Sequence, residues 1–218
     1  MQLSAEIRWF WRGDPQPDFY AWFQSAAVHG YPAGGGKDSR DDIYLSSPAQ
    51  ADLGIKRRGK KSDVEVKGLV EISETRLAVQ PFAGPIELWS KWSSAVLSID
   101  HLPTIATSKL RWLRKFDTSG SEAVEVPLKD DEEPVDGSRP RPVRGCNVEL
   151  TRLTLAGDER WWTFGLESFG PLGTIVNDLC KAAEAIVARQ PPRLPPGQLF
   201  SYPAWLQRHA LAAAARRD

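Results

Sequence analysis

Alternation of apolar and polar positions is the commonest pattern along this chain and predicts strands for most of its elements. Residues 3 to 12, "LSAEIRWFWR", mix charged side chains with aliphatic and aromatic ones, which suits a strand whose two faces meet different surroundings. Glycine-rich or polar turns separate the later alternating segments, so that several of them form hairpins. Further strands are predicted at 41–47, 53–59, 64–72, 109–117, 146–155 and 160–170.

Helical spacing is clearest in "TIVNDLCKAAEAIVAR", residues 174 to 189, with Thr174 as the expected cap. The segment 85–99, "PIELWSKWSSAVLSI", has Pro85 at a helix-start position and apolar side chains at spacings compatible with an amphipathic helix. Shorter helices are expected from Asp18 and, after the Pro-rich run "QPPRLPPGQ", over 203–216.

Residues 118 to 145 turn acidic and then rich in proline and arginine, which indicates a surface loop that contributes little to a core. A chain of 218 residues is long enough for one domain with a sizeable core. We therefore expect one domain over 1–190, with a Pro-rich linker and a C-terminal helix packed on it over 191–218.

The overall charge is balanced, with 28 basic and 28 acidic residues, so any electrostatic function must come from local segregation. Neither nucleic acid nor a membrane is an expected partner. Cys146 and Cys180 lack any metal-ligand spacing and predict free thiols in a reducing compartment. Glu6 and Arg8 interrupt the apolar N-terminal run, and no segment reaches the roughly 18 apolar residues of a membrane span. These features predict a cytoplasmic protein.

Charged residues recur at period two within the predicted strands. In "LGIKRRGKKSDVEVKG", Lys56 and Arg58 share one face of a strand, and Glu65 and Lys67 share one face of the next. The segment "KLRWLR" repeats the device with Lys109 and Arg111. Two interpretations fit the pattern: the wet face of a two-layer sheet, or a polar barrel interior that holds an anion.

Three carboxylates stand among apolar neighbours in predicted strands, namely Glu6, Glu149 and Glu167. Charges are seldom buried unpaired, so cations across a barrel would keep these carboxylates ionised. Their hard oxygen atoms also suit Mg²⁺ or Mn²⁺ bridging phosphate oxygens. The alternative is plain cross-strand ion pairing.

Other motifs point to no second chemistry. "GGGKDS" is not a phosphate-binding P-loop, since Tyr31 stands where the leading glycine belongs and Asp38 follows Lys37. The three histidines are isolated, and no GxSxG nucleophile occurs. Most of the nine tryptophans fall within predicted strands and helices, which favours packing over base stacking.

Taken in order, these segments resemble the CYTH superfamily, or triphosphate tunnel metalloenzymes, a group that includes adenylyl cyclases of one class and thiamine, inorganic and RNA triphosphatases. The resemblance covers residues 3 to 170. The C-terminal "SYPAWL" also resembles the tail of some members, although packing of Tyr202 and Trp205 over the domain explains it as well. The matching segments are "DIYLSSP", "LGIKRR", "VEVKG", "KLRWLR", "VELTRL" and "WTFGLES".

The resemblance implies an α+β fold built on an eight-stranded antiparallel barrel, a tunnel with packed helices. It also implies binding of a triphosphate-containing small molecule or polyphosphate. By position, the phosphate-binding residues would be Arg8, Lys56, Arg58, Lys67, Lys109 and Arg111, and the catalytic, metal-holding carboxylates would be Glu6, Glu149 and Glu167. The implied cofactor is Mg²⁺ or Mn²⁺.

The first strand departs from the family signature Glu-x-Glu-x-Lys. Ser4 replaces the first glutamate and Arg8 replaces the lysine, while Thr151 and Gly165 stand where further acids are expected. The predicted phosphate-binding cations of the site thus match the family pattern better than its predicted metal-binding carboxylates do. Three functions remain open: a metal-dependent phosphohydrolase, an anion-binding barrel without catalysis, and an interaction protein that docks a partner through residues 118–145.

Overall fold

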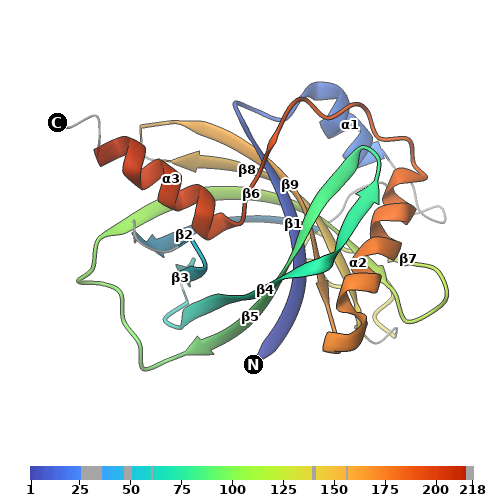
Figure 1. Ribbon diagram of the computed structural model, residues 1–218, viewed down its shortest axis with the longest axis horizontal. Coiled ribbons are helices and arrows are strands. Elements are labelled where there is room, and N and C mark those ends of the chain that lie inside the picture. The colour runs from blue at the N-terminus through green and yellow to red at the C-terminus, as the bar shows by residue number, and fades with distance from the viewer. Residues whose placement is uncertain (26–35, 47–50, 60, 139–140, 156, 215–218) are drawn as a thin grey trace.

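The computed structural model describes the chain except for residues 26–35, 47–50, 60, 139–140, 156 and 215–218. Eight strands form a closed antiparallel barrel in the order β1-β5-β4-β3-β2-β6-β8-β9, which β1 closes by pairing with β9 (Figure 1). The predicted α+β barrel architecture is therefore confirmed. The barrel strands are β1 (Gln2–Arg12), β2 (Gly36–Leu45), β3 (Leu53–Arg58), β4 (Val64–Val79), β5 (Phe82–Ser94), β6 (Thr104–Asp117), β8 (Gly145–Leu155) and β9 (Arg160–Phe169).

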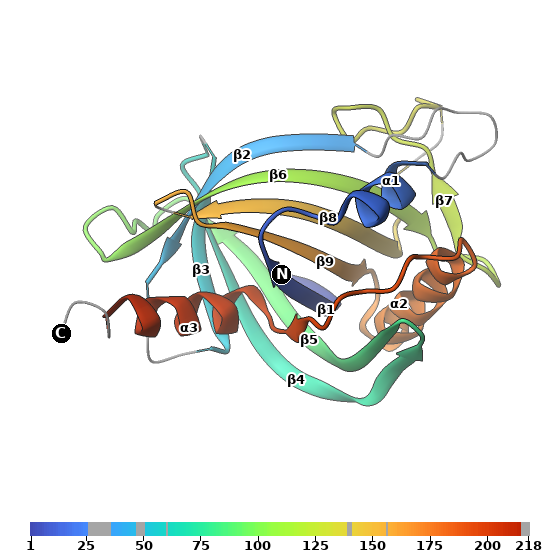
Figure 2. The same ribbon diagram turned by 90° about the horizontal axis from the view of Figure 1, so that it is seen from above.

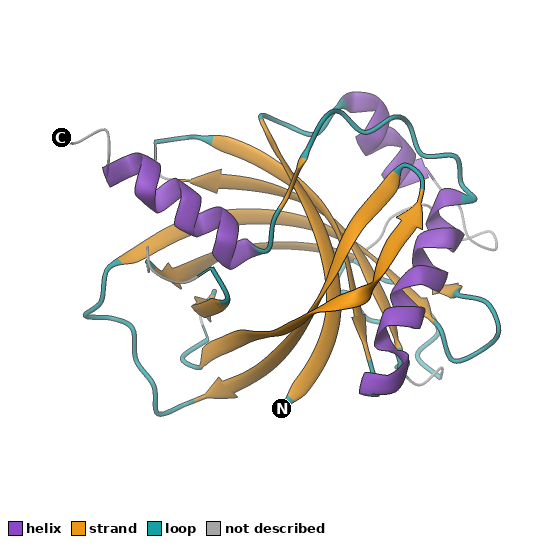
Figure 3. Ribbon diagram, viewed as in Figure 1, coloured by secondary structure: helices purple, strands orange, loops and turns teal. Residues whose placement is uncertain are grey.

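Two short strands pair with individual barrel strands but are not part of the closed ring. The strand β7 (Val124–Val126) pairs with β6, and β10 (Gln198–Leu199) pairs with β1. The helices are α1 (Pro17–Ser25), α2 (Leu172–Val187) and α3 (Tyr202–Ala214), and they lie outside the strands (Figure 3). In two perpendicular views, α2 and α3 lie at opposite ends of the barrel (Figures 1 and 2). No helix within the described residues is both long and apolar enough to cross a membrane.

The main apolar core lies between the barrel wall and helices α1 and α2, so it is outside the barrel rather than within it. Along β1, Ile7 and Trp9 belong to this core, together with Phe19 of α1 and Leu179 of α2. Because successive strand side chains point to opposite faces, the residues between them point into the barrel. The alternation in β1 therefore separates an apolar outer face from a charged inner one that carries Glu6 and Arg8.

The helix predicted over 85–99 is wrong, because the segment begins within strand β5. Its backbone pairs with β1 on one side and with β4 on the other, with Glu87 opposite both Glu6 and Ile72. Ile86 and Leu88 are buried on one face at period two, a spacing that also fits part of a helical pattern. Pairing with two neighbouring strands decided between the two periods, and such pairing is a long-range property.

Smaller differences also have local causes. Helix α2 begins at Leu172, so its cap is Pro171 rather than Thr174, whose hydroxyl instead donates to the Pro171 carbonyl at 3.1 Å. The loop 118–145 includes β7, and its Val126 and Leu128 are buried with Leu113. Part of this polar segment is thus anchored on the barrel. Cys146 and Cys180 are free thiols, as predicted.

Candidate functional site: a charged tunnel

The barrel contains a cavity, with about 730 Å³ of empty space that includes space open to solvent. Eight lysines and arginines and four glutamates line it, contributed by all eight barrel strands. The charged strand faces are therefore barrel interior and not the wet face of a two-layer sheet. All nine predicted site residues are in its wall: Glu6, Arg8, Lys56, Arg58, Lys67, Lys109, Arg111, Glu149 and Glu167. Their roles in binding, catalysis or metal coordination stay predictions.

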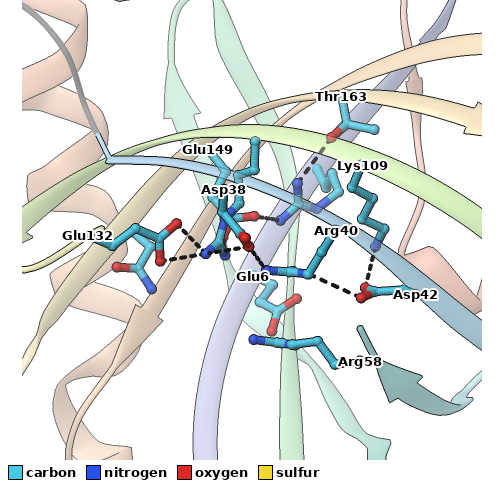
Figure 4. Close-up of polar contacts among 12 residues, drawn as sticks. Glu6, Asp38, Arg40, Asp42, Arg58, Lys109, Glu132, Glu149 and Thr163 are labelled. Atoms are coloured by element: carbon cyan, nitrogen blue, oxygen red, sulfur yellow. Dashed lines mark hydrogen bonds and ion pairs between the residues drawn. The ribbon is translucent and has the colours of Figure 1, made fainter. Parts of the chain in front are cut away.

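Glu149 of β8 lines the tunnel and lies between two guanidinium groups (Figure 4). Its Oε2 accepts a hydrogen bond from Arg8 at 2.7 Å, and its Oε1 accepts one from Arg111 at 2.9 Å. Burial by itself would raise the pKa of Glu149, but Arg111 and Arg8 outweigh burial and hold that pKa well below its usual range. The carboxylate is therefore ionised at neutral pH and fixes both arginines.

Gly165 makes room for Arg8. A Cβ at this position would lie 2.7 Å from the guanidinium carbon of Arg8, closer than side chains pack. Gly165 is opposite Arg8 in the β1–β9 pairing, so the missing side chain lets the guanidinium lie flat against the strand. The absence of an acid here, a departure from the tunnel-family pattern, therefore has a direct consequence for the placement of a cation.

A second centre forms around Asp42 of β2, which is fully buried. Its carboxylate lies 3.1 Å from the amino groups of Lys56 and Lys109 and 3.1 Å from Nε of Arg40. Burial would raise the pKa of Asp42, but Lys109, Lys56 and Arg40 together hold it far below its usual range. Neither Asp42 nor Arg40 was predicted as a site residue; the available signal was an acidic residue two positions before Tyr44 in a strand.

Lys109 is enclosed by aromatic rings. Its amino group lies 4.8 Å from the ring centroid of Tyr44 and 4.0 Å from that of Tyr202, and it donates a hydrogen bond to the Tyr44 hydroxyl. Burial lowers the pKa of Lys109 to about 8, an effect that Asp42 offsets only in part. This lysine therefore titrates close to neutral pH unless further negative charge approaches it.

The remaining acids differ in how they are paired. Glu6 forms an ion pair with Lys67 that outweighs burial and lowers the pKa of Glu6. Glu167 is directly opposite Glu6 in the β1–β9 pairing and has no ion-pair partner among the described side chains. Burial, followed by the neighbouring Glu6, raises the pKa of Glu167. Glu65, a lining residue not predicted as part of the site, lies within 4 Å of Lys56, Arg58 and Lys91.

Helix α3 covers one end of the tunnel. Tyr202 and Pro203 line the cavity, and the buried ring of Trp205 stacks on Phe10 with centroids 4.9 Å apart. A Cβ on Gly54 would lie 2.9 Å from the Pro203 ring, so the helix sits directly on strand β3. The packing interpretation of "SYPAWL" is thus confirmed, and α3 also contributes to the wall of the site.

A second hollow lies beside the tunnel, with about 700 Å³ of empty space that includes space open to solvent. Arg40, Arg58 and Arg111 line both this hollow and the main cavity, so the two are neighbours. Its other lining residues are Asp38 of β2, Gly59 and Lys61, and the loop residues Asp130, Asp131 and Glu132. The loop 118–145 therefore reaches the tunnel, which the sequence pattern did not predict.

The carboxylates do not form an evident divalent-cation site in this arrangement. Within the described residues, no three or more histidine, cysteine, aspartate or glutamate side chains are grouped to hold a metal ion. Lys67 takes both carboxylate oxygens of Glu6, and Arg8 and Arg111 take those of Glu149. As placed here, the donor set fits ion pairing rather than Mg²⁺ or Mn²⁺.

Comparison with protein-family models and with curated proteins finds no match to the sequence. Among solved structures, the chain is similar to the S. pombe Pct1 RNA triphosphatase, with 12% identity and a TM-score of 0.40 over 99% of this chain and 82% of that one. It is also similar to the same enzyme in complex with the Spt5 CTD, with 12% identity and a TM-score of 0.39 over 99% of this chain and 83% of that one.

Proposed function

We propose that the tunnel binds a multiply negative phosphate ligand, of which a triphosphate is the representative class. The observation that carries the proposal is the charge of the cavity wall, where eight lysines and arginines meet only four glutamates. Like charges crowded into an enclosed space repel one another, and a guest with several negative charges offsets that repulsion. Asp42 and Glu132 pair with some of these cations from positions next to the cavity wall, but the lining itself carries more cations than carboxylates.

Unused hydrogen-bond donors support the same proposal. The buried Nε groups of Arg58 and Arg111 have no acceptor among the described residues, and both residues line the cavity. A buried donor without a partner is unfavourable by about 1–3 kcal/mol, so such groups are normally satisfied. Phosphate oxygens suit them, because the planar guanidinium group presents its donors in a geometry that matches phosphate.

Thermal unfolding in the presence of inorganic triphosphate, pyrophosphate or orthophosphate tests the proposal. A ligand that binds only the folded protein raises the midpoint further the more its concentration exceeds its Kd, and we expect triphosphate to raise it most. Lys67→Ala should weaken this effect, whereas Lys181→Ala, which removes a lysine on the outer helix α2, should not. Absence of any midpoint shift at millimolar triphosphate would refute the proposal.

Hydrolysis of the bound ligand is the second candidate function. The feature that favours it is Glu167, a cavity carboxylate that no ion pair occupies among the described side chains. A phosphate-release assay on nucleoside, thiamine and inorganic triphosphates, with Mg²⁺ or Mn²⁺ added, separates turnover from binding. If the site is catalytic, phosphate release should disappear in Glu167→Gln. Binding without release would leave an anion-binding barrel.

A further inference from the structure

An acidic turn places one of the chain's own carboxylates on a tunnel arginine. Glu132 accepts two hydrogen bonds from Nη2 of Arg111, at 2.5 and 2.6 Å (Figure 4). The same guanidinium uses Nη1 to hold Glu149. Asp38 of β2 also lies 3.7 Å from Arg111, so Arg111 is shared between two barrel carboxylates and one loop carboxylate. Arg111 lines both hollows, and Glu132 lines the second one.

The turn is a built feature of the loop. On its N-terminal side, Leu128 is buried against β6 and forms a β-bridge with Pro134. The Glu133 carbonyl accepts a hydrogen bond from the Lys129 amide at 2.8 Å, which closes the turn. The side chain of Glu133 points elsewhere and pairs with the exposed Arg141. Neighbouring glutamates of one turn thus have different partners, and only Glu132 engages the tunnel.

Glu132 has a φ of +67°, a backbone conformation that is unfavourable for residues other than glycine, asparagine and aspartate. Such strain persists where surrounding contacts enforce it, and it is common at ligand clamps and switch regions. The contacts that enforce it here are the closed turn and the pair with Arg111. The positive φ directs the carboxylate of Glu132 to Arg111, which already has Glu149 as a buried counter-ion.

We propose that Glu132 is an exchangeable internal counter-ion of the tunnel, which an anionic ligand displaces from Arg111 on binding. This inference rests on the proposed anion-binding function. Glu149 is on a barrel strand and also holds Arg8, whereas Glu132 is on a loop and pairs with Arg111. A ligand oxygen that approaches Arg111 from the second hollow must compete with Glu132. Glu132 therefore lowers the affinity for every anion that uses Arg111 and partly neutralises the empty tunnel.

The test compares Glu132→Gln with Glu133→Gln. The second variant also removes one negative charge, but from the neighbouring side chain, which lies outside the tunnel. Affinity for inorganic triphosphate is measured by titration calorimetry on the full chain at fixed ionic strength. We expect Glu132→Gln to bind about tenfold tighter than the unmodified protein, the scale of one hydrogen bond to a charged group. Glu133→Gln should bind as the unmodified protein does.

Glu132→Asn provides a second variant, because asparagine lacks the charge and tolerates positive φ. It should also bind more tightly, and it keeps the test informative if Glu132→Gln folds poorly. Unchanged or weaker binding in the folded Glu132 variants, or an equal gain in Glu133→Gln, would overturn the counter-ion role while leaving anion binding intact. Absence of triphosphate binding in all four proteins would instead overturn the proposed function together with this inference.

Discussion

Replacement of Glu149 by glutamine tests whether the tunnel cations depend on the carboxylates among them. The side chains of Arg8 and Glu149 are each 7% exposed, so Glu149→Gln leaves two largely buried guanidinium groups without their shared counter-ion. Breaking a buried ion pair by removing one partner destabilises a protein by about 3–5 kcal/mol. That is a large part of the roughly 5–15 kcal/mol by which a domain is stable. For a chain of this size, the melting midpoint should fall by roughly 6–20 °C.

Urea unfolding followed by circular dichroism, with and without inorganic triphosphate, measures this loss. Because the ligand supplies the missing negative charge, it should raise the unfolding midpoint of Glu149→Gln more than that of the unmodified protein. The control is Asp14→Asn, which breaks the exposed pair with Arg160 and should leave the midpoint nearly unchanged. A loss as small as that of the control, or equal stabilisation of both proteins by triphosphate, would refute the reasoning.

Three further predictions concern groups around the tunnel. Gly165→Ala should push Arg8 aside and lower the affinity for triphosphate by about tenfold. The control is Gly173→Ala on α2, where the added methyl group meets open space and the affinity should not change. Calorimetry measures both affinities, and equal values would contradict the placement of Arg8. Burial lowers the pKa of Lys109 to about 8 in the folded protein, from about 10.5 in the unfolded chain. The neutral form of Lys109 therefore contributes fully to the stability of the fold above about pH 10.5, and this contribution is lost as the pH falls through about 8. Bound triphosphate should raise this pKa again, and calorimetry at pH 8.5 in buffers of different ionisation enthalpy should detect proton uptake that Lys109→Met reduces; proton release would count against it. Trp205→Ala should destabilise the protein by about 3–5 kcal/mol in urea unfolding, because it removes a buried ring that stacks on Phe10 and leaves a cavity. A loss of stability below about 1 kcal/mol would show that α3 does not close the tunnel end.

Period-two alternation is a local property, and it made most of the barrel strands predictable, whereas the nine tunnel residues were assigned through the resemblance to the tunnel family. Side chains two apart in a strand share a face whatever the strand pairs with, so Lys56 with Arg58 and Lys109 with Arg111 had to point the same way. Strand β5 was missed for the opposite reason. Ile86 and Leu88 fit two periods, and only hydrogen bonding to β1 and β4 selected the strand.

The polar loop shows where sequence patterns stop being informative about the site. The run of acids at 130–133 indicates an exposed segment, but nothing in it distinguishes Glu132, which binds Arg111, from Glu133, which binds Arg141. The distinction arises from the turn that Leu128 anchors on the barrel. Asp42 was missed similarly, because its three cationic neighbours come from β2, β3 and β6.

The sequence by itself determined which charges share a strand face and predicted free thiols for the cysteines, and its resemblance to the tunnel family implied a charged barrel. Tertiary structure decided that this face is the interior, because β1 closes on β9 while α1 and α2 cover the apolar side. It also decided which carboxylate meets which cation. Ion pairs form between side chains brought within about 4 Å, and in this barrel those side chains come from strands and loops distant in the chain.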